Sequence, residues 1–282
     1  MDDATVPPWR KEERDPRAPA ARLPRVALIE FRGVKKAFGP KVIYRGLDLQ
    51  IEAGEALTII GGSGQGKSVM LRMLIGLLGI DGGEIVFDGK RISGLSEREY
   101  LPIRRRIAML FQAAALFDSM TVGENVAYGL RSVGELSDPE IRERVAESLS
   151  YVGLEGKQDL WPGGLSSGMK KRVGLARAIA MRPEVLLYDE PTTGLDPVNI
   201  NRIIDLILHL QRTLNITSVV VTHDMHTAIR VSNRIAMINN GGIIFSGDIR
   251  AIVTCQDPMV KDFIEGNAVE EPPRAAQSGN AI

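Results

Sequence analysis

Apolar and polar residues alternate in two stretches near the start of the chain, ALIEFRGV (27–34) and VIYRGLDLQIEA (42–53). Alternation of this kind predicts β-strands with one buried face. The next segment, ALTII (56–60), is continuously apolar and predicts a fully buried strand. We expect that strand to lead into a helix over residues 68–78.

Further along the chain, the apolar spacing becomes helical. The region from about residue 96 to residue 182 is expected to be mainly helical. The expected helices are EREYLPIRRRIAML, DPEIRERVAESLSYVGL and SSGMKKRVGLARAIAM. Strands and helices are then expected to alternate through VLLYDE, INRIIDLILHLQRTL, SVVVTHD, MHTAIRVS, RIAMINN and GIIFSG. This alternation predicts an α/β fold, in which helices cover a parallel sheet.

Composition separates the two ends of the chain from its body. Residues 1–27 contain five prolines and many charges of both signs, and residues 266–282 are rich in proline and small polar residues. We expect a disordered N-terminal arm and a flexible C-terminal tail, because neither segment has much apolar surface to bury. The folded domain is then expected at residues 28–265, with a helical subdomain at about 96–182.

The overall charge and the cysteine content restrict the possible functions. The 35 basic and 35 acidic residues cancel, so the basic excess of a nucleic-acid binder is missing. The single cysteine, Cys255, excludes an internal disulfide and suits a reducing compartment. The apolar run at 69–80 is shorter than the roughly 20 residues that span a bilayer. Because the N-terminus also lacks a signal-peptide core, we expect a cytosolic protein, in which any membrane role must come through a partner.

A glycine-rich segment between the strand at 56–60 and the helix at 68–78 fits the phosphate-binding pattern G-x-x-x-x-G-K-[ST]. Its residues are Gly61, Gly62, Ser63, Gly64, Gln65, Gly66, Lys67 and Ser68. The glycines let backbone N–H groups surround a phosphate at a helix N-terminus. Lys67 would reach the β- and γ-phosphates of a nucleotide, and the Ser68 hydroxyl would bind Mg²⁺. An ordinary glycine-rich turn would not require a lysine and a serine at these places.

The apolar strand VLLYDE delivers two carboxylates, Asp189 and Glu190, at its C-terminal end. Ligands bind open α/β sheets at this end of the strands. Asp189 is placed to hold Mg²⁺ through water, and Glu190 to orient or deprotonate the attacking water. Many strands end in a solvated acidic turn, so the pair indicates a catalytic site only together with the phosphate loop.

The segment LSSGM (165–169), taken with the phosphate loop, VLLYDEP, Gly194-Leu195-Asp196 and His223, resembles the ABC ATPase family over about residues 28–265. The resemblance implies an ABC-type P-loop NTPase core with a mainly parallel sheet, an antiparallel β subdomain and an inserted α-helical subdomain. It also implies a dimer, in which Ser166, Ser167 and Gly168 of one copy contact the γ-phosphate held by the other. Ser167 stands where the family has glycine, which adds a side chain where backbone approaches phosphate.

The same resemblance assigns roles to four single residues. Gln112 would touch Mg²⁺ or the attacking water and link the helical subdomain to the site. His223 would contact the γ-phosphate, although a lone histidine after a strand is usually structural. Asp196 would lie at the dimer seam. Phe38 is the candidate to stack on adenine, although it could equally belong to the core.

Several segments are similar to the ATPases of Mla/Mce-type lipid transporters: FQAAALF (111–117), TVGENV (121–126), YDEPTTGLDP, VTHDM and VKDFIEG. The similarity implies phospholipid transport between inner and outer membranes, at the cytoplasmic side of the inner membrane. The implied partners are an integral membrane permease, an MCE-domain periplasmic lipid-binding protein and a STAS-domain protein. The alanines after Gln112 are expected to make room for a permease helix.

Two alternatives stay open. The chain could energise an amino-acid or other small-solute importer. It could also be a soluble ABC ATPase that acts on ribosomes or DNA. Soluble ribosomal members usually carry two cassettes, and the DNA-repair members carry long coiled-coil or zinc insertions, whereas this sequence has one cassette and no such insertion.

Overall fold

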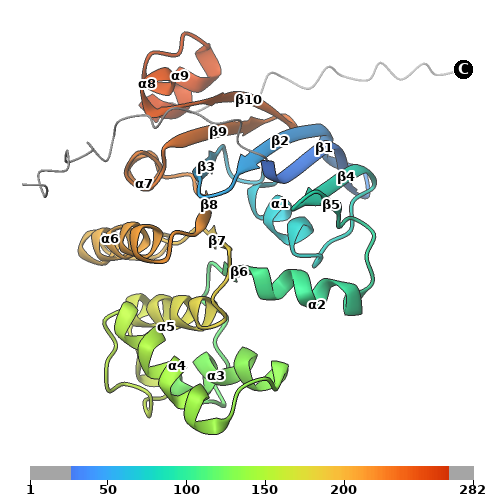
Figure 1. The fold of residues 1–282 in the computed structure, drawn as a ribbon. Helices are drawn as coiled ribbons and strands as arrows, with labels where there is room; N and C mark the ends of the chain where they lie inside the picture. Colours follow the sequence, from blue (N-terminus) through green and yellow to red (C-terminus); the bar gives the residue numbers. More distant parts are fainter. Residues whose placement is uncertain (1–26, 267–282) are drawn as a thin grey trace, which may run out of the picture.

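The computed structural model describes residues 27–266, so nearly all of the expected arm (1–27) and tail (266–282) lies outside the described residues. Within the described part, the strands form two sheets (Figure 1). The first sheet is antiparallel, has the strand order β2-β1-β4-β5, and consists of β1 (Ala27–Phe38), β2 (Lys41–Glu52), β4 (Gly82–Phe87) and β5 (Lys90–Arg91).

The second sheet has the order β10-β9-β3-β8-β7-β6. It consists of β3 (Ala56–Ile60), β6 (Ile107–Leu110), β7 (Val185–Asp189), β8 (Thr217–Val221), β9 (Arg234–Asn239) and β10 (Gly242–Gly247). All its pairs are parallel except the edge pair of β9 and β10. Every residue of β7 and β8 is buried, which explains why residues 185–188 and 219–221 are continuously apolar. The C-terminal ends of β3, β7 and β8 therefore meet at one edge of the sheet.

The helices cover both faces of this sheet and extend beyond one end of it. Helices α3 (Val122–Val133), α4 (Asp138–Tyr151) and α5 (Ser167–Ala180) form a group at one end of the molecule (Figure 1). Helices α8 (Ile249–Val253) and α9 (Pro258–Glu265) lie at the opposite end, beside β10. The remaining helices are α1 (Lys67–Leu74), α2 (Glu97–Arg106), α6 (Pro197–Leu214), α7 (Met225–Val231) and the short 3₁₀ turn Pro162–Gly164. None of the helices in residues 27–266 is long and apolar enough to cross a membrane.

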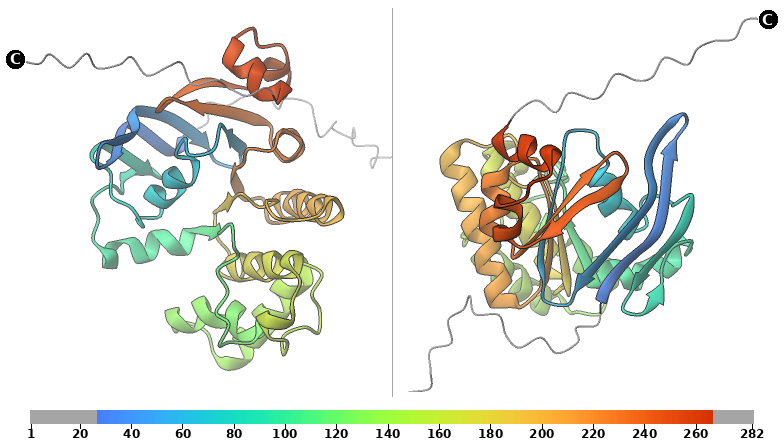
Figure 2. Two further views of the ribbon diagram at one scale, coloured as in Figure 1. Left: turned by 180° about the vertical axis from the view of Figure 1, so that it is seen from behind. Right: turned by 90° about the horizontal axis from the view of Figure 1, so that it is seen from above.

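Successive residues of the central strands point to opposite faces of the sheet and pack into two different hydrophobic cores. Val185 and Leu187 of β7 belong to a core shared with α1 and the antiparallel sheet, whereas Leu186 and Tyr188 belong to a core shared with α3–α6. Seen from above, β1 and β2 lie on one side of the six-stranded sheet and α6 on the other (Figure 2). Burial on both faces holds β7 in place, and with it the two acidic residues at its end.

Part of the sequence prediction was wrong in this region. Residues 107–110 were expected to continue a helix, but they form β6, which pairs with β7 from Ile107↔Val185 to Leu110↔Tyr188. Helix α2 ends at Arg106, where three consecutive arginines give way to the apolar strand. Four apolar residues are compatible with either structure, and pairing with a buried neighbour decides for the strand. Strands β4 and β5 were not predicted, although they complete the antiparallel sheet.

Candidate nucleotide-binding site

The glycine-rich loop at residues 61–68 connects β3 to α1, as expected. Two of its glycines have no room for a side chain. A Cβ on Gly61, whose φ is 151°, would lie 2.4 Å from the carbonyl oxygen of Ile238, and one on Gly66, whose φ is 98°, would lie 2.5 Å from Ile43. No side chain of the described residues caps the start of α1. The first N–H groups of this helix thus point to a site suited to an anion.

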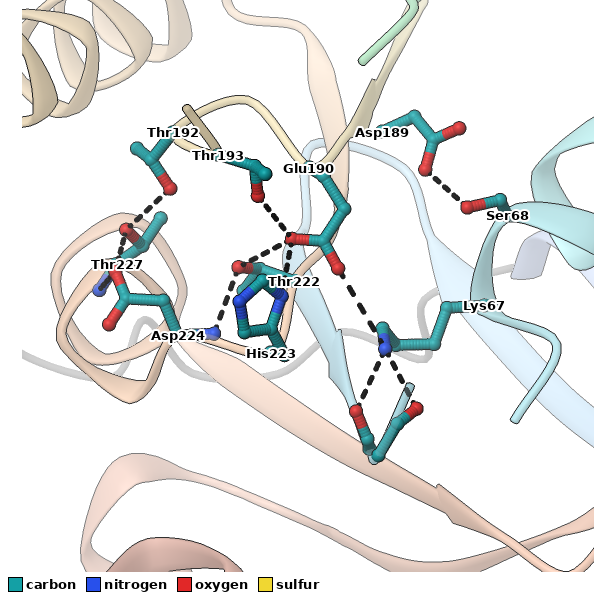
Figure 3. A network of polar contacts seen from close by, with 12 residues as sticks. Lys67, Ser68, Asp189, Glu190, Thr192, Thr193, Thr222, His223, Asp224 and Thr227 are labelled. Atoms are coloured by element: carbon teal, nitrogen blue, oxygen red, sulfur yellow. Dashed lines mark hydrogen bonds and ion pairs between the residues drawn. The ribbon is translucent and has the colours of Figure 1, made fainter. Parts of the chain in front are cut away.

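The Lys67 ammonium lies between the loop and the acidic end of β7 (Figure 3). It donates to the carbonyl oxygens of Gly61 at 2.8 Å and Gly62 at 3.1 Å, and it lies 3.8 Å from Oε1 of Glu190. Burial lowers the pKa of Lys67, and the nearby carboxylates of Glu190 and Asp189 oppose that shift. Lys67 therefore places a positive charge at the mouth of the loop, which suits the binding of a phosphate.

The hydroxyl of Ser68 donates to Oδ1 of Asp189 at 2.5 Å, which joins α1 to β7. Asp189 is 1% exposed, and burial raises its pKa against the opposing effects of the Ser68 hydrogen bond and Arg72. A hydroxyl and a carboxylate side by side fit Mg²⁺, which takes oxygen ligands and keeps several waters. Residues 27–266 hold no cluster of three or more His, Cys, Asp or Glu side chains that would form a metal cage of their own.

Glu190 has the left-handed backbone conformation, with a φ of 47°, and its N–H donates to the carbonyl of Val221 on β8. Its Oε2 atom accepts from the hydroxyls of Thr193 at 3.1 Å and Thr222 at 3.4 Å, and Nδ1 of His223 lies 2.9 Å from the same oxygen. Figure 3 shows these groups converging on the carboxylate. The two threonines were not predicted. The sequence could have indicated them, because Thr193 lies close after Glu190 and Thr222 directly precedes His223.

A pocket of about 550 Å³ contains most of the predicted residues. It is lined by Phe38, Lys41, Ile43, Ser63, Gly64, Gly66, Lys67, Ser68, Val69, Gln112, Glu190 and His223. Phe38 is 45% exposed in this wall and therefore does not belong to the core. Lys41, Ile43 and Val69 were not predicted; Lys41 and Ile43 follow Phe38 closely in the chain. Phosphate loop, acidic strand, glutamine and histidine thus come together around one cavity.

The four residues expected at a dimer seam lie outside this pocket. Ser166 is the N-cap of α5 and accepts from the N–H of Met169 at 3.3 Å. Gly168 packs against Asn199, which donates to Oδ2 of Asp196 at 2.5 Å. Ser166, Ser167 and Asp196 are exposed. The starts of α5 and α6 therefore form one cluster at the surface of the described chain.

The segment after Gln112 differs from the expectation. Ala114 is 1% exposed, and a Cβ on Gly174 of α5 would approach Ala114 to 3.2 Å. Ala114 and Ala115 have φ values of 62° and 48°, and Arg177 of α5 donates to both of their carbonyl oxygens. The small size of Ala114 thus serves a contact inside the chain, and only Ala113 and Ala115 remain exposed to a partner.

The glycine-rich loop, the Ser68–Asp189 pair and the Glu190 carboxylate at the edge of a parallel sheet define a P-loop nucleoside triphosphatase. Residues 44–193 match the family described as ABC transporter, and the chain belongs to that family. The chain is accordingly an ATPase of the ATP-binding cassette type.

Three relatives illustrate the similarity. The chain is 38% identical to the probable ribonucleotide transport ATP-binding protein mkl of Mycobacterium tuberculosis (strain H37Rv), over 90% of this chain and 71% of the relative. It is 39% identical to the intermembrane phospholipid transport system ATP-binding protein MlaF of Haemophilus influenzae, over 86% of this chain and 91% of the relative. A dimeric, post-hydrolysis structure of the ATP-binding cassette MJ0796 with ADP and Pi has a TM-score of 0.72, at 33% identity over 79% of this chain and 99% of that one.

Proposed function

We propose that the chain energises phospholipid transport between the inner and outer membranes, as the ATPase of an Mla/Mce-type transporter. The observation that carries this proposal is the 39% identity to MlaF of Haemophilus influenzae, which extends over 86% of this chain and 91% of the relative. The arrangement of the pocket supports the ATP-dependent part of the function. We place the chain at the cytoplasmic side of the inner membrane, bound to a permease.

We assign the triphosphate of ATP to the N–H groups of the loop at 61–68 and to the Lys67 ammonium, and the adenine to the exposed face of Phe38. Mg²⁺ would be held by Ser68, Asp189 and Gln112, and would neutralise charge on the phosphates. The 2.5 Å contact between Ser68 and Asp189 and the place of Gln112 in the pocket wall support this assignment.

Glu190 is the proposed base that accepts a proton from the attacking water. The hydroxyls of Thr193 and Thr222 hold its carboxylate in one direction, and His223, beside it, would contact the γ-phosphate. Lys67 lies 3.8 Å from Oε1 of Glu190. When Lys67 pairs with phosphate instead, Oε1 becomes available to the water, so that nucleotide binding prepares the base.

We propose that two copies sandwich two ATP molecules. Ser166, Ser167, Gly168 and Asp196 lie outside the pocket of their own chain, and the related MJ0796 cassette is described as a dimer. The N-terminus of α5 is a suitable anion site for the γ-phosphate held by the other copy. Binding would close the dimer and hydrolysis would release it, because the bridging phosphate exists only before hydrolysis.

The surface beside the Gln112 segment is our proposed permease contact. Phe117 and Tyr128 are 40% and 47% exposed, and their ring centroids lie 4.7 Å apart. Tyr128 also lines a hollow of about 420 Å³, together with Met120, Glu124, Arg131 and Ser132. Exposed aromatic residues at a surface hollow are typical anchors of a protein interface. The proposed occupant is a helix of an MlaE-like permease, which an MCE-domain protein and a STAS-domain protein would accompany.

A small-solute importer remains the second candidate, because the mkl relative, at 38% identity, is named for ribonucleotide transport. The test is purification of the tagged chain in mild detergent, with mass spectrometry of bound proteins and extraction of bound lipid. Recovery of a permease, an MCE-domain protein and phospholipid supports the lipid function. Recovery of a solute-binding protein without an MCE-domain protein or phospholipid would replace it with the importer.

A further inference from the structure

Helix α5 carries a buried lysine that has no role in the mechanism above. Lys171 is 5% exposed, and its ammonium donates to the carbonyl oxygens of Glu190 at 3.1 Å and Thr193 at 2.9 Å. Lysine is almost never fully buried unless its charge is satisfied. Burial removes the ammonium from water and lowers the pKa of Lys171 to about 8.

The two carbonyls belong to the turn that directs the proposed base. Glu190 holds a left-handed backbone conformation, which non-glycine residues keep only where the surroundings enforce it. The turn closes through the N–H of Thr193, which donates to the Glu190 carbonyl at 3.3 Å, while the Thr193 hydroxyl holds the Glu190 carboxylate. Lys171 therefore binds both ends of a turn whose side chains direct the carboxylate.

Lys171 also connects the Glu190 turn to the start of α5. Lys171 lies five residues after the N-cap Ser166, on the same helix. Gly168 lies between them and packs against Asn199, which in turn donates to Asp196. The exposed cluster at the starts of α5 and α6 is thus joined to the Glu190 turn through one buried side chain.

We propose that Lys171 is a positioning residue for ATP hydrolysis. It fixes the Glu190 turn to α5, so that the position of α5 sets the direction of the Glu190 carboxylate. Lys171 does not line the pocket and acts through the backbone of Glu190. The inference rests on the proposed function, in which Glu190 is the base.

The test compares variants of the full chain in steady-state ATP hydrolysis and in ATP-binding titrations. Lys171→Met keeps most of the apolar stem and removes the ammonium, so we expect kcat to fall by about 10- to 100-fold, as for small misplacements of a reacting group. KM and Kd for ATP should stay within about twofold, because the pocket walls are unchanged. Lys171→Gln should recover part of the lost kcat, since its NH₂ group has two donors for the two carbonyls.

The neighbouring Lys170 provides the matched control, since it is only half-buried and lies on the same helix. Lys170→Met should leave kcat and KM unchanged. A Lys171→Met enzyme with kcat within twofold of the unmodified chain would overturn the proposal. Equal losses of kcat and ATP affinity in the Met and Gln variants would also overturn it, because they would indicate a general structural role.

If Lys171→Met does not fold, Lys171→Gln decides alone: a several-fold lower kcat at normal ATP affinity supports the proposal, and an unchanged kcat overturns it. Glu190→Gln is measured in the same series. An inactive Glu190→Gln beside an active Lys171→Met would show that only the positioning role is wrong. An active Glu190→Gln would refute the base assignment, and the inference with it.

Discussion

Replacing Glu190 by glutamine should separate ATP binding from hydrolysis. The glutamine amide has nearly the same size, and its oxygen can still accept from the hydroxyls of Thr193 and Thr222 that hold Oε2. Lys67 loses a carboxylate at 3.8 Å but keeps the carbonyls of Gly61 and Gly62. We therefore expect little change in folding or in ATP affinity.

The substitution should slow the chemical step of ATP hydrolysis. A positioned general base contributes about 10²- to 10⁴-fold, which corresponds to about 3–5 kcal/mol of activation free energy. Phosphate release by Glu190→Gln should fall by that factor, while ATP affinity stays within about twofold. With ATP and Mg²⁺, gel filtration should show a dimer that persists, because the bridging γ-phosphate is no longer removed.

Glu184→Gln is the matched control, since Glu184 directly precedes β7 and pairs with Arg106 at the surface, away from the pocket. It should leave turnover unchanged. A Glu190→Gln variant that hydrolyses ATP at more than about one hundredth of the normal rate would refute the base assignment, because the minimum contribution of a general base would then be missing. Loss of ATP binding in this variant would place Glu190 in binding instead of catalysis.

Four further variants test other parts of the site. Lys67→Ala should weaken ATP binding at least about tenfold in calorimetry and abolish turnover, because the phosphates lose their cation. Asp189→Asn should abolish turnover yet raise the melting temperature of the nucleotide-free protein. Burial raises the folded-state pKa of Asp189 above its unfolded value, so the wild type loses stability as the pH rises through that interval, and asparagine removes this cost. Ala115→Glu should reduce permease copurification at normal ATP affinity, whereas Ala114→Glu should lower the melting temperature by several degrees, because it buries a charge.

Each of these expectations can fail. Unchanged ATP affinity and turnover in Lys67→Ala would contradict the phosphate assignment of the loop. A lower melting temperature of Asp189→Asn across the carboxyl titration range would show that its charge stabilises the fold. Normal permease recovery with Ala115→Glu would move the proposed contact away from the Gln112 segment.

The phosphate loop could be predicted in detail from the sequence, because its chemistry is local. Gly61 and Gly66 occupy positions where the backbone conformation and the lack of space exclude side chains, and Lys67 and Ser68 follow directly on the helix. The acidic pair at the end of β7 was equally visible, since an apolar strand delivers it to the sheet edge. Short-range sequence patterns of this kind predict site residues where neighbours in the chain are also neighbours in space.

Features that depend on residues distant in the sequence were determined only by the tertiary structure. Residues 107–110 became a strand because β7 lies beside them, and Ala114 is small because Gly174 of α5 packs against it. Lys171 looks like an ordinary helix cation in the sequence, and it is a buried donor because the Glu190 turn, 19 residues further on, presents two carbonyls to it. Hydrophobic periodicity and turn chemistry act over a few residues, whereas burial and hydrogen-bond pairing are settled only when the elements pack together.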